Sequence, residues 1–215
     1  MSYQLRTRED IAQEIARDIP DGAVVNLGIG IPTYVSNFIP AGREVILHSE
    51  NGILGLGPKP AEGEEDYDLI NAGKQPVTLL PGGCFFHHAD SFAMMRGGHL
   101  DIAVLGAYQV SAQGDLANWS TGDLSVIPAV GGAMDLAVGA KQVWAAMPLF
   151  TKQGECKIVD TCGYPLTAAR CTTRVYTDYG TFAFDEDGLY LLNAVTGLAH
   201  SELEDRMGMT LRTHA

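Results

Sequence analysis

The chain has 215 residues, of which 46% are hydrophobic and 19% charged, a composition typical of a folded globular protein with a sizeable core. Its formal net charge of −12 argues against nucleic acid and anionic membranes as partners, because both attract clusters of Lys and Arg. The N-terminal residues lack the apolar core of a signal peptide, no apolar run is long enough to span a bilayer, and the four cysteines show no CxxC spacing. We therefore expect a cytoplasmic protein with reduced thiols.

The N-terminal part of the chain alternates between helical and strand patterns. A helix start at residues 7–10 is followed by Ile11, Ile15 and Ile19, which fall on one helical face. A strand is predicted at 23–27, a helix opened by Pro32 at 32–38, and another strand at 44–47. This strand–helix–strand spacing indicates two parallel strands of one sheet.

The remaining chain continues this rhythm and then changes character. Apolar strands are predicted at 76–80, 100–108 and 141–147, with a short helix at 91–95, and such apolar strands favour a sheet covered on both faces. Residues 170–192 alternate around a turn at 185–188, which predicts a late β-hairpin, and a last helix is predicted from a capping box at Ser201 to Gly208. We expect one α/β domain over residues 1–215, with an open, mostly parallel sheet and helices on both faces.

Residues 48–57, HSENGILGLG, place the carboxylate of Glu50 where a strand ends and a glycine-rich segment begins. Three interpretations compete: a solvated strand end, an acid that binds ribose, and a nucleophile. The ribose interpretation needs the dinucleotide fingerprint, which Gly28 and Gly30 imitate after the preceding strand. Thr33 stands where the third glycine of that fingerprint would allow close helix packing, so dinucleotide binding is disfavoured.

Five blocks of the sequence resemble the B subunit of the 3-oxoacid CoA-transferases: VVNLGIGIPT (24–33), SENGILGLGP (49–58), LINAGKQ (69–75), SFAMMRGGHLDIAVLGAYQVSAQGDLANW (91–119) and VGGAMDLAVGA (130–140). The resemblance implies an open α/β fold, a partner A subunit in a heterodimer or heterotetramer, and transfer of CoA from succinyl-CoA to a 3-oxoacid. In this family the glutamate of SENG is the nucleophile, and it matches Glu50.

The implied chemistry explains why a carboxylate stands alone. Glu50 would attack the acyl-CoA carbonyl to form a mixed anhydride, and the released CoA thiolate would convert it to a glutamyl-CoA thioester. A glutamate with a pKa of about 4.3 is already ionised at neutral pH, so no separate base is required. Gly52, Gly55 and Gly57 have no Cβ to obstruct a bulky acyl-CoA, which makes them candidates for substrate access.

The resemblance also suggests residues that assist the nucleophile. It places backbone oxyanion donors at Gly131 and Gly132, in the loop before a short helical pattern. Asn26 ends a strand beside that of Glu50 and could orient the carboxylate, and Lys74 could hold a carboxylate substrate or tune Glu50. Taken without the family, Asn26 is more often a strand cap and Lys74 more often a solvated turn residue.

The acyl acceptor is predicted from residues 85–92, FFHHADSF, which look like the 3-oxoadipate branch of the family. The alternative acceptor is acetoacetate, but the acetoacetate branch of the family usually lacks the paired histidines. A dicarboxylate needs a second electropositive contact, which His87, His88 or Arg96 could supply. The competing interpretation makes both histidines ordinary turn residues at a helix start.

Other chemistries are weaker interpretations. Cys84, His87, His88, Asp90 and His99 are metal-ligand types, but their spacing matches no zinc pattern. We expect no metal and no permanently bound cofactor, with the CoA thioester acting as a substrate. Two alternatives from other classes are an acyl-CoA hydrolase, which would release CoA without an acceptor, and a non-catalytic scaffold subunit, in which Glu50 would be dispensable.

Overall fold

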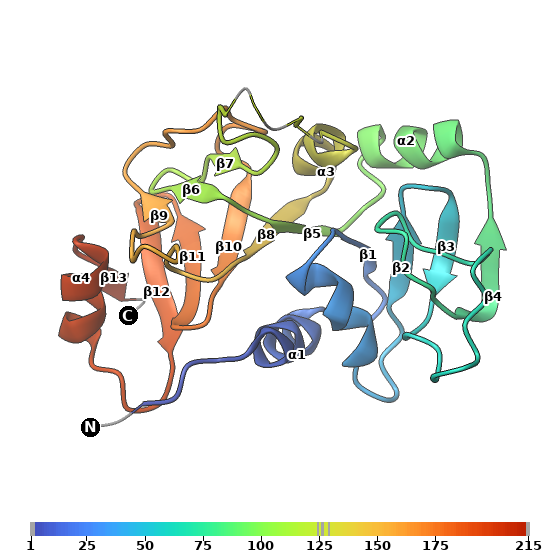
Figure 1. The fold of residues 1–215 in the computed structure, drawn as a ribbon, viewed down its shortest axis with the longest axis horizontal. Coiled ribbons are helices and arrows are strands. Elements are labelled where there is room, and N and C mark those ends of the chain that lie inside the picture. Colours follow the sequence, from blue (N-terminus) through green and yellow to red (C-terminus); the bar gives the residue numbers. More distant parts are fainter. Residues whose placement is uncertain (1–2, 124, 126, 129, 214–215) are drawn as a thin grey trace.

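The computed structural model describes residues 3–123, 125, 127–128 and 130–213. Within these residues a ten-stranded sheet crosses the whole molecule in the order β13-β12-β11-β10-β8-β5-β1-β2-β3-β4 (Figure 1). Its strands are β1 (Val24–Leu27), β2 (Ile46–Ser49), β3 (Ile53–Leu56), β4 (Leu79–Phe85), β5 (Ile102–Gly106), β8 (Gln142–Ala146), β10 (Thr172–Tyr176), β11 (Gly180–Asp185), β12 (Gly188–Ala194) and β13 (Arg212–Thr213). A small sheet adds β6 (Gln109–Ser111), β7 (Leu116–Ala117) and β9 (Ile158–Val159). The helices are α1 (Arg8–Asp18), the 3₁₀ helix η1 (Ile31–Asn37), α2 (His88–Arg96), α3 (Ala133–Gly139) and α4 (His200–Met207).

The centre of the large sheet is parallel and its flanks are largely antiparallel. Strands β2, β1, β5, β8 and β10 run in the same direction, so their carboxyl ends meet at one edge. On one flank β3 and β4 are antiparallel to their neighbours, and on the other flank β10, β11 and β12 form antiparallel pairs. The predicted open α/β sheet with a late hairpin is therefore confirmed, as a mixed sheet with a parallel centre.

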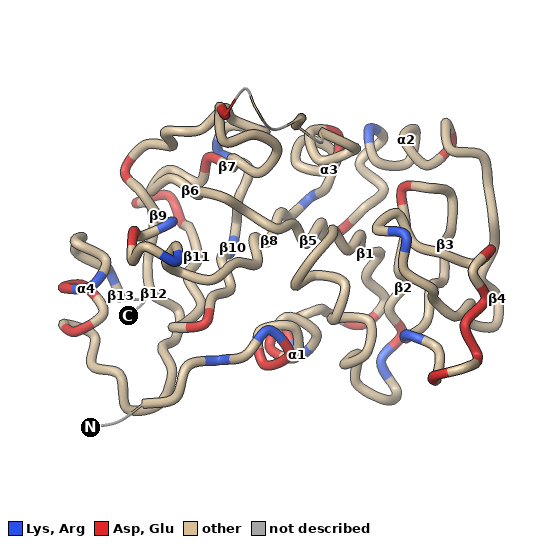
Figure 2. Tube along the Cα trace, in the orientation of Figure 1, with Lys and Arg blue, Asp and Glu red and all other residues tan. Residues whose placement is uncertain are grey.

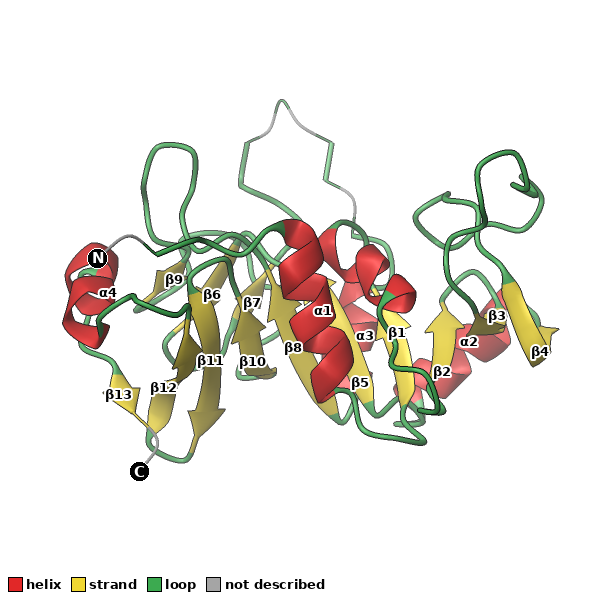
Figure 3. Cartoon of the chain, turned by 90° about the horizontal axis from the view of Figure 1, so that it is seen from below, coloured by secondary structure: helices red, strands yellow, loops and turns green. Residues whose placement is uncertain are grey.

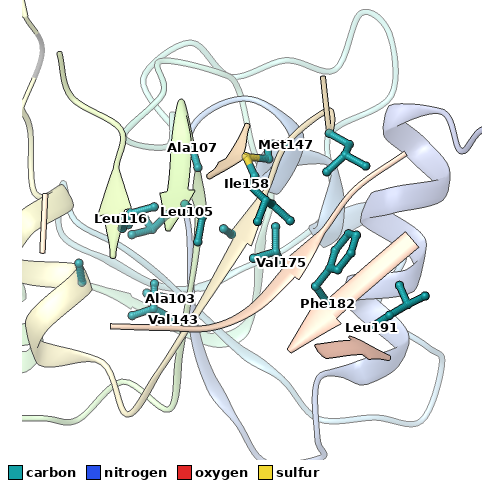
Figure 4. Close-up of a cluster of buried hydrophobic side chains, with 14 of the residues drawn as sticks. Ala103, Leu105, Ala107, Leu116, Val143, Met147, Ile158, Val175, Phe182 and Leu191 are labelled. Carbon is teal, nitrogen blue, oxygen red and sulfur yellow. The ribbon is translucent and has the colours of Figure 1, made fainter. Parts of the chain in front are cut away.

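The two faces of the sheet carry separate apolar cores, because side chains alternate along each strand. In β5, Ile102 and Val104 belong to the core beneath α1 and η1, whereas Ala103 and Leu105 belong to the core that includes α2 and α3. Figure 3 shows α1 in front of the sheet with α3 behind it. Figure 4 shows the second core, a continuous cluster of strand residues that includes Leu105 and Phe182.

Most predicted elements form close to their expected bounds, with three corrections. The helix expected at 32–38 is the 3₁₀ helix η1, a short connector after Gly30. The strand expected at 76–80 begins at Leu79 and runs to Phe85, antiparallel to β3. The capping box at Ser201 is wrong, because α4 begins at His200 and the Glu204 carboxylate instead accepts a hydrogen bond from the Leu211 N–H at 2.7 Å.

The helix start predicted at residues 7–10 is confirmed, and a capping box at Thr7 fixes the start of α1. The Asp10 N–H donates to Thr7 Oγ1 at 3.1 Å, and the Thr7 N–H donates to the Asp10 carboxylate at 2.8 Å.

Acidic residues of the exposed segment 62–68 lie in the loop between β3 and β4 (Figure 2). None of the helices in the described part of the chain has the length and apolarity needed to cross a membrane.

Candidate active site

A cavity of about 610 Å³ opens at the carboxyl ends of the central parallel strands. This is where open α/β sheets usually bind ligands, because the loops that leave neighbouring strands diverge there. The walls come from the segments after β1, β2, β5 and β8 and from the loop before α3. The lining includes Asn26, residues 27–31, Glu50, residues 105–108, Asn118, residues 130–133 and residues 146–148.

Glu50 lies immediately after β2, in a turn closed by a hydrogen bond from the Gly52 N–H to the Ser49 carbonyl at 3.0 Å. The side chain is half-buried, and its carboxylate accepts a hydrogen bond from the Gly132 N–H. Burial raises the pKa of Glu50, and the Gly132 amide and the charge of His88 oppose this shift. A partly desolvated carboxylate held by a main-chain donor is placed to act as a nucleophile.

The predicted oxyanion glycines lie directly against this carboxylate. A Cβ on Gly132 would occupy the space of Glu50 Oε2, and a Cβ on Gly131 would lie 3.6 Å from Oε1. Gly132 has a φ of −89°, which any residue can adopt, so the space around Glu50 is what requires glycine here. The structure thus brings Gly131 and Gly132 to Glu50, while their role as oxyanion donors stays a prediction.

Asn26 lines the same cavity and is buried, with 3% of its surface exposed. Its Nδ2 donates to His48 Nδ1 at 3.0 Å and to the His48 carbonyl at 3.2 Å. On the other side of the ring, His48 Nε2 lies 2.9 Å from Ser91 Oγ in α2. Sequence reasoning missed His48; the available signal was a titratable residue at an inward-facing position of a strand, two residues before Glu50.

Lys74 lies at the tip of a turn near the cavity and is exposed. Its φ is +62°, and its N–H donates to the Asn71 carbonyl at 2.9 Å. The loop reaches the cavity through Ala72, whose N–H donates to Ser49 Oγ at 3.0 Å. The Lys74 side chain therefore starts from a loop that borders the site, and its predicted contact with substrate or with Glu50 remains untested.

The glycines predicted to give access to acyl-CoA pack within the chain. A Cβ on Gly52 would meet the Phe86 carbonyl oxygen, and a Cβ on Gly57 would meet Thr78 Oγ1. Gly55 has a φ of +83°, and a Cβ there would lie 2.8 Å from the Cα of Gly83 in β4. Close packing of β3 on its neighbours thus explains these glycines, and their role in substrate access stays a prediction.

The three predicted acceptor-binding residues all belong to α2 or its cap but have different partners. His87 caps the helix, because its Nδ1 accepts the Ala89 N–H at 3.1 Å. Arg96 forms a salt bridge with Asp135 of α3, with 2.6 Å between Nε and Oδ1. The His88 ring packs on Phe92 at 4.8 Å, and His88 is near enough for its charge to lower the pKa of Glu50.

Within the described residues, no group of three or more His, Cys, Asp or Glu side chains is arranged to hold a metal ion. The site instead joins one carboxylate, main-chain donors and a cavity of substrate size. A chain of this fold with such a carboxylate is suited to covalent transfer of an acyl or thioester group.

Comparison with known proteins agrees with a protein that transfers an acyl or thioester group. A model of the coenzyme A transferase family matches residues 8–196, and the chain belongs to that family. It is 58% identical over 211 residues to the B subunit of 3-oxoadipate CoA-transferase from Acinetobacter baylyi, covering 98% of this chain and 97% of the relative. It is 46% identical to the B subunit of a probable succinyl-CoA:3-ketoacid coenzyme A transferase from Bacillus subtilis, covering 93% of this chain and 92% of the relative.

The architecture has a counterpart among solved structures. An acyl-CoA transferase from Escherichia coli O157:H7 superposes with a TM-score of 0.75 at 20% identity, covering 100% of this chain and 43% of that chain. At this identity the similarity establishes the shared fold alone. The resemblance found in the sequence blocks is thus confirmed by the family match and by the fold.

Proposed function

We propose that the chain is the catalytic B subunit of a CoA-transferase that moves CoA from succinyl-CoA to 3-oxoadipate through a glutamyl-CoA thioester on Glu50. The observation that carries the proposal is the Glu50 carboxylate, held by the Gly132 N–H in a cavity of about 610 Å³. The names of the relatives at 58% and 59% identity support 3-oxoadipate as the acceptor and the need for a partner A subunit.

In the proposed reaction a Glu50 oxygen attacks the thioester carbonyl of succinyl-CoA, and the C–S bond breaks to release CoA thiolate. The thiolate then attacks the Glu50 acyl carbon of the mixed anhydride, which releases succinate and leaves the glutamyl-CoA thioester. The acceptor carboxylate attacks this thioester, and the same two steps in reverse restore Glu50 and give the new acyl-CoA. Each attack creates an oxyanion, for which the N–H groups of Gly131 and Gly132 are the proposed donors.

Intact mass of the chain co-purified with its A subunit tests the nucleophile. Incubation with succinyl-CoA should add the mass of CoA minus one water, and peptide sequencing should map the addition to Glu50. The matched control is the complex carrying Glu50→Gln, which should show no addition and no transfer. Transfer that persists in a Glu50→Ala complex would reduce the chain to a scaffold, and steady CoA release without an acceptor acid would indicate a hydrolase.

The acceptor is proposed to be a dicarboxylate that His88 recognises through its second carboxylate. Of the predicted contacts, His87 is engaged as a helix cap and Arg96 by Asp135, whereas His88 is electrostatically coupled to Glu50. The kcat/KM for 3-oxoadipate should exceed that for acetoacetate, and His88→Gln should reduce this ratio. His87→Asn is the control, because asparagine also caps helices. Equal kcat/KM values would favour the acetoacetate alternative, which the 46% identical relative represents.

The proposal includes one domain over residues 1–215 and a cytoplasmic location. All four cysteines of the chain are free thiols, as is usual in a reducing compartment. Coenzyme A enters as a substrate and leaves as a product, so the proposed cycle uses no bound cofactor. The proposal leaves open whether the chain and its partner form a heterodimer or a heterotetramer.

A further inference from the structure

A buried polar chain connects the cavity to α2 through the His48 ring. His48 is 1% exposed and Ser91 fully buried, and their contact is 2.9 Å between Nε2 and Oγ. On the cavity side, Asn26 Nδ2 lies 3.0 Å from His48 Nδ1. The ring also stacks on Phe86 with centroids 6.0 Å apart, so it is held in place by both polar and apolar contacts.

The hydrogen bonds define how the protons are arranged. The amide nitrogen of Asn26 has two hydrogens and no acceptor capacity, and both hydrogens point to His48, one to Nδ1 and one to the main-chain carbonyl. Nδ1 must therefore be an acceptor, which places the ring proton on Nε2, where it donates to Ser91 Oγ. Burial keeps this ring neutral by lowering the pKa of His48 to about 4.

This arrangement determines which atom of Asn26 faces the substrate. The Oδ1 atom has no hydrogen-bond partner among the described residues. Every buried side-chain oxygen in those residues does have a partner, so Oδ1 is not one of the buried atoms. Oδ1 is therefore the atom that Asn26 presents to the cavity that it shares with Glu50. A flipped amide would set Oδ1 against the main-chain carbonyl oxygen of His48, which is an acceptor whatever the tautomer of the ring, so the flip is disfavoured.

We propose that His48 is a positioning residue: its neutral ring holds the Asn26 amide with Oδ1 towards the cavity, as an acceptor for an N–H group of the bound CoA thioester. The pantetheine arm of CoA carries two secondary amides, which are donors of this kind. This inference rests on the proposed function, because it assigns a contact of the same substrate. It differs from the expectation that Asn26 orients the Glu50 carboxylate, because it gives the side-chain oxygen of Asn26 a substrate partner.

A double-mutant cycle in the complex with the A subunit separates positioning from a structural role. His48→Phe should lower kcat/KM for succinyl-CoA by about tenfold, the effect of one lost hydrogen bond, mainly through a higher KM. His48→Gln should restore most of the activity, because glutamine can accept from Asn26 and donate to Ser91. In an Asn26→Ala background the His48→Phe change should have less than about a twofold effect. Equal losses in both backgrounds, or no rescue by glutamine, would overturn the proposal.

Two further measurements keep the inference testable if His48→Phe does not fold. Nitrogen NMR of the histidine-labelled wild-type complex, with His48→Gln to assign the signal, should show a neutral ring protonated at Nε2 between pH 6 and 8. An Nδ1-protonated ring, or a charged one, contradicts the inference. Mass analysis of the wild-type complex shows whether Glu50 forms the thioester. Its absence rejects the proposed function, whereas an adduct together with additive mutant effects rejects this inference alone.

Discussion

Two groups of glycines flank Glu50, and they are glycines for different reasons. On the α3 side, Gly132 has an ordinary φ of −89°, and a Cβ there would take the place of the Glu50 carboxylate. On the β3 side, Gly52 has a φ of +105°, and a Cβ there would meet the carbonyl oxygen of Phe86. The first group leaves room for a reactive side chain, and the second allows the backbone of β3 and its turn to pack closely.

The difference separates the requirements of chemistry from those of folding within one site. A change at Gly132 on the α3 side should alter reactivity while the fold persists, because its φ of −89° is open to any residue and the atoms nearest an added Cβ are those of the Glu50 carboxylate. A change on the β3 side should weaken the fold first, because β3 is held between β2 and β4. Both sides meet at Glu50, so activity alone does not distinguish them, and stability must be measured beside it.

Gly132→Ala should produce the largest effect on activity. The added methyl group would displace the Glu50 carboxylate and move the main-chain N–H that it binds, so kcat/KM should fall by about 10²–10³, comparable to the loss of an oxyanion donor. The thermal unfolding midpoint should fall by no more than about 4 °C, because Gly132, although buried, has an unstrained backbone, and the atoms nearest the added Cβ belong to the end of the flexible Glu50 side chain. Gly163→Ala is the control, since a Cβ there lies 3.8 Å from its nearest neighbour and away from the cavity lining. A large drop in stability would contradict the assignment of Gly132 to the chemical side.

Gly52→Ala should destabilise the protein by about 3 kcal/mol, the sum of backbone strain and overpacking. Chemical denaturation measures this difference. Gly22→Ala is the matched control: Gly22 has a φ of +76°, and a Cβ there would have no atom within 4 Å, so its alanine variant reports strain without a clash. If the two variants lose equal stability, the contact with Phe86 does not explain Gly52.

The comparison also shows how far sequence reasoning reaches into the fold. The helix start at residues 7–10 and the apolar strands at the centre were predictable, because a few neighbouring residues determine each of them. Strand β3 was not, because Ile53–Leu56 includes one glycine and precedes another, and it becomes a strand through pairing with β2 and β4. The glycines in and beside β3 were expected to give acyl-CoA access, which stays a prediction, and the pairing of β3 adds a packing reason that the sequence did not suggest.

The candidate site likewise has features that the sequence predicted and features that only the tertiary structure shows. The proximity of Asn26, Glu50 and Gly132 followed from parallel strands whose carboxyl ends share an edge, together with the family resemblance. The role proposed for His48 depends on its contacts with Asn26 in β1 and Ser91 in α2, which no spacing in the sequence connects. Engagement of Arg96 by Asp135 is likewise a tertiary contact between two helices.

The pH dependence of stability should sharpen the description of the β3 side, where His48 stacks on Phe86. The pKa of His48 is lowered from 6.5 to about 4, so the unfolded chain binds more protons than the folded one between these values. Stability is therefore complete above pH 6.5 and is lost as the pH falls towards 4, and the contribution of His48 should amount to about 2 kcal/mol between pH 7 and pH 5. His48→Gln should lose correspondingly less stability over the same range, as measured by denaturant titrations at each pH. Parallel curves for the two proteins would show that His48 is not a buried neutral ring.

Glu50→Gln should have the smallest effect on stability, and its sign is the informative result. Burial raises the pKa of Glu50 above its usual 4.5, so the folded chain binds the extra proton and wild-type stability falls as the pH rises through the raised pKa. Glutamine has the same shape and no charge, and its side-chain oxygen can still accept from Gly132, so the variant should unfold at a higher temperature than wild type at pH 7. The gain should disappear below about pH 4.5, where wild-type Glu50 is itself neutral. A lower unfolding temperature at pH 7 would mean that the Gly132 N–H and the charge of His88 outweigh burial, and that the α3 side stabilises the ionised nucleophile rather than merely making room for it.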